Sequence, residues 1–112
     1  MELAALGLSE GCPVILYLQS PTEKVWGLLL SFSPAGILVR GLDLVIFDDW
    51  MRQEARGEEE MLGLTTLFYP MHRVLRMERD ERVGRLPSYA ERFERLVGRT
   101  VLEASRGPLV RQ

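Results

Sequence analysis

Apolar residues along this chain follow two periodicities, one typical of strands and one typical of helices. Val14–Leu18 is a continuous apolar run, as expected for a strand that is buried on both faces. Residues 24–33 alternate instead, so that Trp26 and Phe32 share one predicted face. Residues 64–69 are rich in β-branched and aromatic side chains, which favour strands. The strands predicted in this way are residues 14–18, 24–33, 37–44, 64–69 and 73–79.

Two glycines, Gly27 and Gly41, lie inside these predicted strands. A glycine weakens a strand unless the sheet bends sharply or another backbone approaches at that position. Small barrels need such bends in order to close. The sequence therefore predicts a mainly β fold, a five-stranded and strongly bent barrel with peripheral helices, over residues 11–80.

Residues 45–63 form a predicted insertion between the third and fourth strands. Asp48 and Asp49 precede good helix formers and Gly57 follows them, which predicts a helix of about two turns with the aspartates as its N-cap. The large apolar side chains of this insertion would either cover an open end of the barrel or anchor a partner, including a second copy of the chain. These candidate interface residues are Phe47, Trp50 and Met51.

The segment 81–112 is predicted to hold a C-terminal helix and a tail, within a single domain that spans residues 1–112. Ser88 and Glu91 have the spacing of a capping box, and Gly98 ends the helical pattern that follows. Residues 2–8 predict one or two helical turns, and residues 100–102 predict a short edge strand.

Composition narrows the function classes. The chain has 112 residues and a net charge of −2, so it carries no global basic field that would attract nucleic acid. Its single cysteine, Cys12, excludes an intrachain disulfide and a cysteine zinc cluster. The first residues lack the basic start of a signal peptide, and no apolar run approaches the roughly 20 residues that span a bilayer. We therefore expect a cytoplasmic protein that does not enter a membrane.

Catalytic motifs are missing from the sequence: there is no HExxH spacing, no phosphate loop and no recognisable triad. Asp48 and Asp49 would point about 100° apart on a helix, so they converge poorly on a metal or a substrate. Cys12 has no basic neighbour in sequence that would activate its thiol. We expect a protein without catalytic activity, cofactor or metal.

The words GCPVILYL and KVWGLLLSFSPAGILV resemble the Sm-like family, and in particular its bacterial member, the RNA chaperone Hfq. Gly27, Ser31 and Phe32 occupy the places of the family's early glycine and its Ser-Phe pair, and His72 falls on the family histidine. The sequence departs from Hfq at Ser33 and Met71, so the resemblance implies the fold more directly than the RNA chemistry.

The resemblance implies a binding or assembly module that forms homo-oligomers, with the fourth and fifth strands pairing edge to edge between subunits. Another protein could dock on the insertion or on the C-terminal helix. The alternative is single-stranded RNA binding, which needs stacking aromatics beside a basic groove. Each candidate for RNA contact also has a purely structural explanation, such as a surface salt bridge or a polar residue at a bend. These candidates are Phe32, Arg40, His72 and Arg73.

Overall fold

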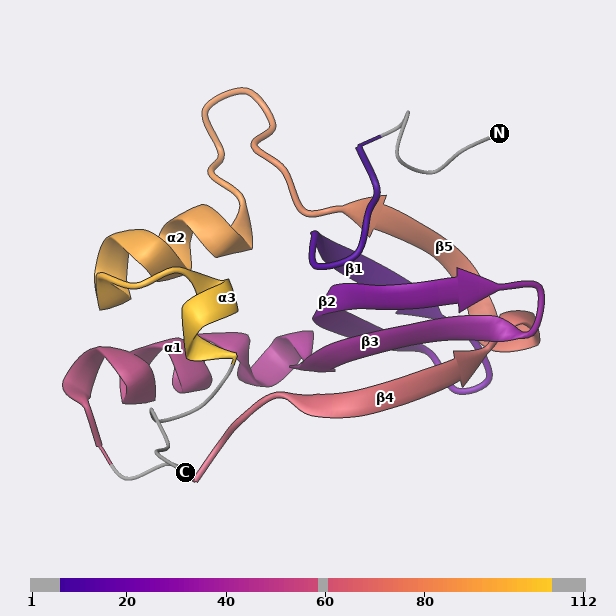
Figure 1. Cartoon of the computed structure of the whole chain (residues 1–112), viewed down its shortest axis with the longest axis horizontal. Coiled ribbons are helices and arrows are strands. Elements are labelled where there is room, and N and C mark those ends of the chain that lie inside the picture. The colour runs from indigo at the N-terminus through magenta and orange to yellow at the C-terminus, as the bar shows by residue number, and fades with distance from the viewer. Residues whose placement is uncertain (1–6, 59–60, 106–112) are drawn as a thin grey trace.

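The computed structural model describes residues 7–58 and 61–105. Five antiparallel strands form one sheet in the order β4-β3-β2-β1-β5 (Figure 1). All five predicted strands are therefore confirmed, with small shifts at their ends. Their bounds are β1 (Pro13–Leu18), β2 (Glu23–Ser33), β3 (Gly36–Asp43), β4 (Thr65–Pro70) and β5 (Val74–Arg79).

Helical segments lie between β3 and β4, between β4 and β5, and after β5. The capping box of Ser88 and Glu91 and the left-handed Gly98 are both present, as predicted. The short strand predicted at residues 100–102 is wrong, because Thr100 and Glu103 form a second capping box that starts a helix there. The helical bounds are η2 (Leu44–Ile46), α1 (Phe47–Arg56), η3 (Met71–Arg73), α2 (Tyr89–Val97) and α3 (Val101–Ala104).

Helix α1 begins at Phe47, before both of the predicted N-cap residues and directly after the turn of η2. Ile46 is its N-cap and makes no side-chain cap, so the predicted capping by Asp48 and Asp49 is wrong. Both aspartates instead lie in the first turn, where a negative charge favours the helix dipole. Gly57 ends the helix in the left-handed conformation, as the sequence indicates. The predicted turns at residues 2–8 lie almost wholly outside the described residues.

The sheet bends so strongly that η3 contacts turns from two distant parts of it. The Met71 N–H donates to Ala35 O in the β2–β3 turn, and the Gln19 N–H, after β1, donates to Arg73 O, each at 2.9 Å. Irregular register in β2 near Leu29 and in β5 opposite Leu18 adds to this bend.

The prediction that the strands close into a barrel is nevertheless wrong. Strands β4 and β5 form the two edges of the described sheet and share no ladder. The chain passes from one edge to the other within the single turn of η3, and the two strands diverge from that corner (Figure 1). No ladder hydrogen bonds join the two described strands, and side chains from both of them pack against the core that the sheet surrounds.

Each face of the sheet carries its own core. We call the face that the curled sheet surrounds the enclosed face; its core is Val14, Leu16, Leu18, Val25, Leu29, Ile37 and Val39. The opposite, helix-covered face packs against the helices, and its core is Ile15, Trp26, Leu28, Leu42, Phe47, Trp50, Met51, Leu64, Phe93, Val101 and Ala104. This arrangement explains why β1 is apolar: its two faces pack against different cores, and four of its six residues are buried.

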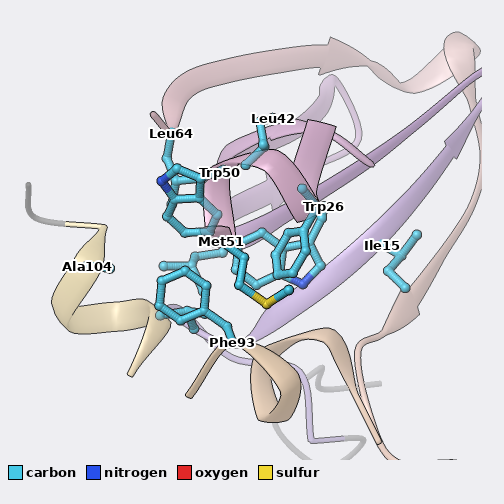
Figure 2. Packing of buried hydrophobic residues seen from close by; sticks show 11 residues of the cluster. Ile15, Trp26, Leu42, Trp50, Met51, Leu64, Phe93 and Ala104 are labelled. Carbon is cyan, nitrogen blue, oxygen red and sulfur yellow. The ribbon is translucent and has the colours of Figure 1, made fainter. Parts of the chain in front are cut away.

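Aromatic rings dominate the helix-covered core (Figure 2). The ring of Trp50 stacks on Phe93 of α2 with centroids 4.6 Å apart, and Phe47 meets Trp26 of β2 edge-on at 5.0 Å. Phe47, Trp50 and Met51 are 0%, 1% and 6% exposed. Of the two roles that the sequence leaves open for these residues, packing within the fold is the one observed, because the C-terminal helices cover all three side chains.

Candidate functional site: two open sheet edges

The described sheet has two edges without a backbone partner. Strand β4 pairs only with β3, and strand β5 pairs only with β1. Each edge therefore presents a row of unpaired N–H and C=O groups, which is a template for pairing with another strand. Both strands have six residues, so their lengths match.

The β4 edge is uncharged along its whole length, TTLFYP. Natural edge strands are usually protected from pairing by charged residues or by proline. Strand β4 has no charged residue, and its one proline, Pro70, stands at its end. Phe68 is 53% exposed, although its ring lies over the backbone of Gly36, where an added Cβ would be 2.9 Å from Cε1. An uncharged edge with an exposed aromatic ring favours association.

Hydrogen-bond alternation shows which groups of β4 face outward. The Met71 N–H donates to Ala35 O. Pro70 and Gly36, which lie opposite each other one position further along, are therefore a pair that exchanges no backbone hydrogen bonds with each other. Bonded and non-bonded pairs alternate along an antiparallel ladder. Thr66 and Phe68 therefore direct their own N–H groups away from β3, toward the free side.

The β5 edge is charged and irregular. Arg76 and Glu78 form an ion pair at 3.0 Å, and Leu75, at the register shift, is 65% exposed. The Asp80 N–H donates to Pro13 O at 2.9 Å, just past the last pair of the ladder. By the same alternation, Met77 and Arg79 direct their N–H groups outward.

The guanidinium of Arg73 forms hydrogen bonds with other residues of the chain. Nε donates to Gln19 O at 3.1 Å, and Nη2 donates to Pro21 O at 2.7 Å and to a Glu23 carboxylate oxygen at 3.0 Å. The guanidinium also lies 5.8 Å from the ring centre of Tyr69. These contacts fasten the β1–β2 turn to η3, so the side chain stabilises the bend of the sheet.

The other candidates for RNA contact do not converge. Phe32 lies opposite Ile37, on the enclosed side of the ladder, because the irregular register near Leu29 reverses the alternation that places Trp26 on the other face. Arg40 lies opposite Leu28, on the helix-covered side, and its Nη1 contacts Thr66 Oγ1 at 3.4 Å. His72 is exposed on η3, where its carbonyl accepts from Gln19.

Most arginines of the described chain are neutralised by a carboxylate within 4 Å. The residues paired in this way are Arg52, Arg56, Arg73, Arg76, Arg79, Arg82, Arg92 and Arg99. Two of these pairs clamp the insertion to the segment after β5: Arg92 with Asp48 and Arg99 with Glu54, each at 2.8 Å. The acidic insertion and the basic C-terminal part thus compensate each other.

In strand β4, the pKa of the Tyr69 phenol is shifted from its ordinary value. Burial of its ring against the enclosed core raises the pKa of the phenol above its ordinary value of 10.0. The carboxylates of Glu23 and Asp43 raise this pKa further, and Arg73 lowers it in part. The phenol is therefore a stable neutral group beside the open edge.

Two open hollows lie on the surface of the described residues. One, of about 410 Å³, is lined by Thr22, Glu23, Lys24, Asp43, Leu44 and Val45. The other, of about 350 Å³, lies between the end of β5, the Val83–Leu86 bridge and the start of α2. In the described part of the chain no three His, Cys, Asp or Glu side chains gather as a metal site would require.

Sequence reasoning predicted that the fourth and fifth strands offer edges, but it missed the groups that point outward. These groups are the backbone N–H of Thr66, Phe68, Met77 and Arg79. The alternation of residue types in the sequence indicates which face of the sheet each side chain occupies. Which backbone N–H groups are paired within the sheet depends instead on which strand lies beside β4 or β5.

Within residues 7–58 and 61–105, no helix has the length and apolarity needed to cross a bilayer. Comparison with known proteins found no matching family model, no matching curated protein and no matching solved structure. The resemblance to the Sm-like family accordingly stays a prediction from the sequence.

Proposed function

We propose that this protein is a non-catalytic, Sm-like assembly module whose copies associate by pairing the β4 edge of one with the β5 edge of the next. The observation that carries the proposal is the pair of open edges, equal in length, on one strongly bent sheet. Joining two different edges is a heterologous contact, and it can close into a ring. A closed ring leaves no edge unpaired, whereas a dimer through β4 alone would leave both β5 edges open.

Size-exclusion chromatography with light scattering tests this proposal at micromolar concentration. The unsubstituted chain should have the mass of an oligomer larger than a dimer. Thr66→Pro removes one outward N–H from the β4 edge without removing a hydrogen bond to β3, so it should shift the mass toward the monomer. Thr66→Val is the matched control, because it keeps the N–H and the β-branched shape and should remain oligomeric. A monomeric unsubstituted chain would rule the proposal out.

RNA binding, the alternative from the sequence, has weaker support. A single-strand groove combines stacking aromatics with free positive charge. Here Phe32 and Arg40 lie on opposite sides of the sheet, and the donors of Arg73 are engaged with backbone and Glu23. A saturable interaction with oligo-U or oligo-A at low salt would restore this alternative.

A further inference from the structure

We infer that α2 and α3 form a hinged lid, which opens as one unit while the sheet stays folded. We call residues 88–104 the lid and residues 81–87 the connector. Opening uncovers the rings of Phe47 and Trp50, for which the sequence alone leaves a partner role open. The inference does not depend on how copies of the chain associate. It rests on the separate core of the sheet, on the few attachments of the lid, and on the build of the connector.

The core on the enclosed face does not depend on the lid. Its seven buried residues come from β1, β2 and β3, and the partly buried residues packed against them precede residue 80. The four ladders likewise join strands only. When the lid opens, the ladders and this core are therefore kept. Proteins open in such cooperative units when one part of the structure keeps its own contacts.

Few apolar side chains attach the lid. Phe93 is the one fully buried residue of α2, and its ring stacks on Trp50 of α1. The ring of Tyr89 meets Phe47 edge-on, with centroids 5.2 Å apart. From α3, only Val101 and Ala104 are buried. The lid thus packs mainly on α1, and Figure 1 shows the three helices together on one side of the sheet.

Two ion pairs fasten the lid to α1. Arg92 Nη2 donates to Asp48 Oδ1, and Arg99 Nη2 donates to Glu54 Oε1, each at 2.8 Å. The side chains of Arg92, Asp48 and Arg99 are 36% to 48% exposed, so water competes for these contacts. The Glu54 side chain is only 8% exposed, which makes its pair with Arg99 the stronger attachment.

Asp80 fastens the start of the lid to the sheet. Its carboxylate accepts from the N–H groups of Tyr89 and Ala90, and also from Trp26 Nε1 of β2. When the two helix amides leave, this carboxylate keeps the tryptophan as a partner. Asp80 therefore remains on the sheet, and the chain beyond it is the part that moves.

The connector has the build of a hinge. Its Val83 and Leu86 exchange two backbone hydrogen bonds around Gly84, which has a φ of 59°. Both of these apolar side chains are exposed. In the described part of the chain, no backbone hydrogen bond ties residues 81–87 to the sheet. Figure 1 shows the connector as a loop that projects between β5 and α2.

Hydrogen exchange followed by mass spectrometry on the full chain tests the lid. The amides of α2 and α3 should exchange together, faster than those of β1–β3 by roughly tenfold or more. Arg99→Gln leaves Glu54 Oε1 without its donor and should accelerate exchange over the whole lid by roughly tenfold. Arg95→Gln is the matched control, because Arg95 is exposed on α2 and has no carboxylate within 4 Å in the described chain.

Arg92→Gln separates opening of a unit from local fraying. Arg92 lies within α2 and Arg99 follows it, yet both substitutions should accelerate the same set of amides. Acceleration confined to the neighbourhood of each substitution would overturn the lid. Equal exchange rates for the lid and for β1–β3 would also overturn it, because only global unfolding would then expose these amides.

Thiol labelling gives an independent readout. Val101→Cys and Val39→Cys are each introduced into a Cys12→Ser chain. Val101 is 7% exposed under the lid, and Val39 is 0% exposed in the enclosed core. A disulfide reagent such as dithiobis-nitrobenzoate should react with the Val101→Cys chain at the rate of lid opening, and with the Val39→Cys chain only on global unfolding. Equal reaction rates in the two chains would show that the lid does not open by itself.

Discussion

Gly27 of β2 and Gly41 of β3 lie directly opposite each other in the sheet. A Cβ built on Gly41 would be only 2.8 Å from the Cα of Gly27 and closer still to Trp26 O. A Cβ on Gly27 would be 3.1 Å from the Cα of Gly41. At this position the two strands therefore approach each other more closely than a Cβ atom on Gly41 would allow.

Gly41→Ala should destabilise the fold by about 1–3 kcal/mol, because the backbone must move to admit the methyl group. Gly27→Ala should cost less, because its nearest neighbours stand at 3.0–3.2 Å. Gly63→Ala is the matched control, since nothing lies within 4 Å of its added Cβ and its φ is not in the left-handed region. Urea unfolding measures all three, and equal stability of the Gly41 and Gly63 variants would contradict the close approach.

Asp80 joins the sheet to the C-terminal helices. Its carboxylate accepts from Trp26 Nε1 at 3.0 Å and from the N–H groups of Tyr89 and Ala90 at 2.9 Å, and the residue is only 6% exposed. Asp80→Ala should cost about 3 kcal/mol, because each buried donor left without a partner costs roughly 1–3 kcal/mol.

The measurement for Asp80→Ala is urea unfolding followed by tryptophan fluorescence. Asp49→Ala serves as control, because Asp49 makes an exposed ion pair with Arg52 and should change stability by less than about 1 kcal/mol. If both variants unfold at the same urea concentration, Asp80 does not hold the helices in place.

Trp50→Ala should unfold the protein more readily, by about 3–5 kcal/mol, as for other large-to-small substitutions in a core. The ring fills the space between the sheet and Phe93, and it is 1% exposed. Thermal unfolding followed by circular dichroism measures the loss. If the variant keeps the stability of the parent chain but no longer associates, Trp50 contacts a partner and does not stabilise the core.

Tyr69→Phe should make stability less sensitive to alkaline pH. Burial, then Glu23 and Asp43, raise the pKa of the folded phenol above 10.0, so the folded chain keeps this proton longer than the unfolded chain. The contribution of Tyr69 is complete below the unfolded pKa and is lost as the pH rises through the folded one.

Denaturant unfolding between about pH 9 and 11 tests the Tyr69 prediction, because a free phenol titrates near pH 10. The free energy of unfolding of the parent chain should fall more steeply than that of Tyr69→Phe over this range. Parallel curves would show that the folded environment leaves this phenol unperturbed.

The strands and the helix ends could be predicted from the sequence, because they depend on residues that are close together along the chain. The capping box of Ser88 and Glu91 and the helix stops at Gly57 and Gly98 depend on neighbours within a few residues. The same signal was present but overlooked at Thr100 and Glu103, where a strand was expected. Gly27 and Gly41 were predicted to mark a bend or a close backbone approach, and the structure shows the close approach.

Contacts between residues that are far apart in the sequence could not be predicted from local patterns. The apolar face of Phe47 and Trp50 fits a partner surface and a core equally well in sequence, and only the path of α2 decides between them. The role of Asp80 is of the same kind, since Trp26 is 54 residues away.

The sequence by itself determined where strands, turns and helix ends lie, because these depend on side-chain periodicity and on hydrogen bonds between near neighbours. Only the tertiary structure decided that the sheet stays open, with β4 and β5 at its edges. That outcome depends on the angle at which the turn of η3 directs β5 away from β4, and no local sequence pattern encodes that angle.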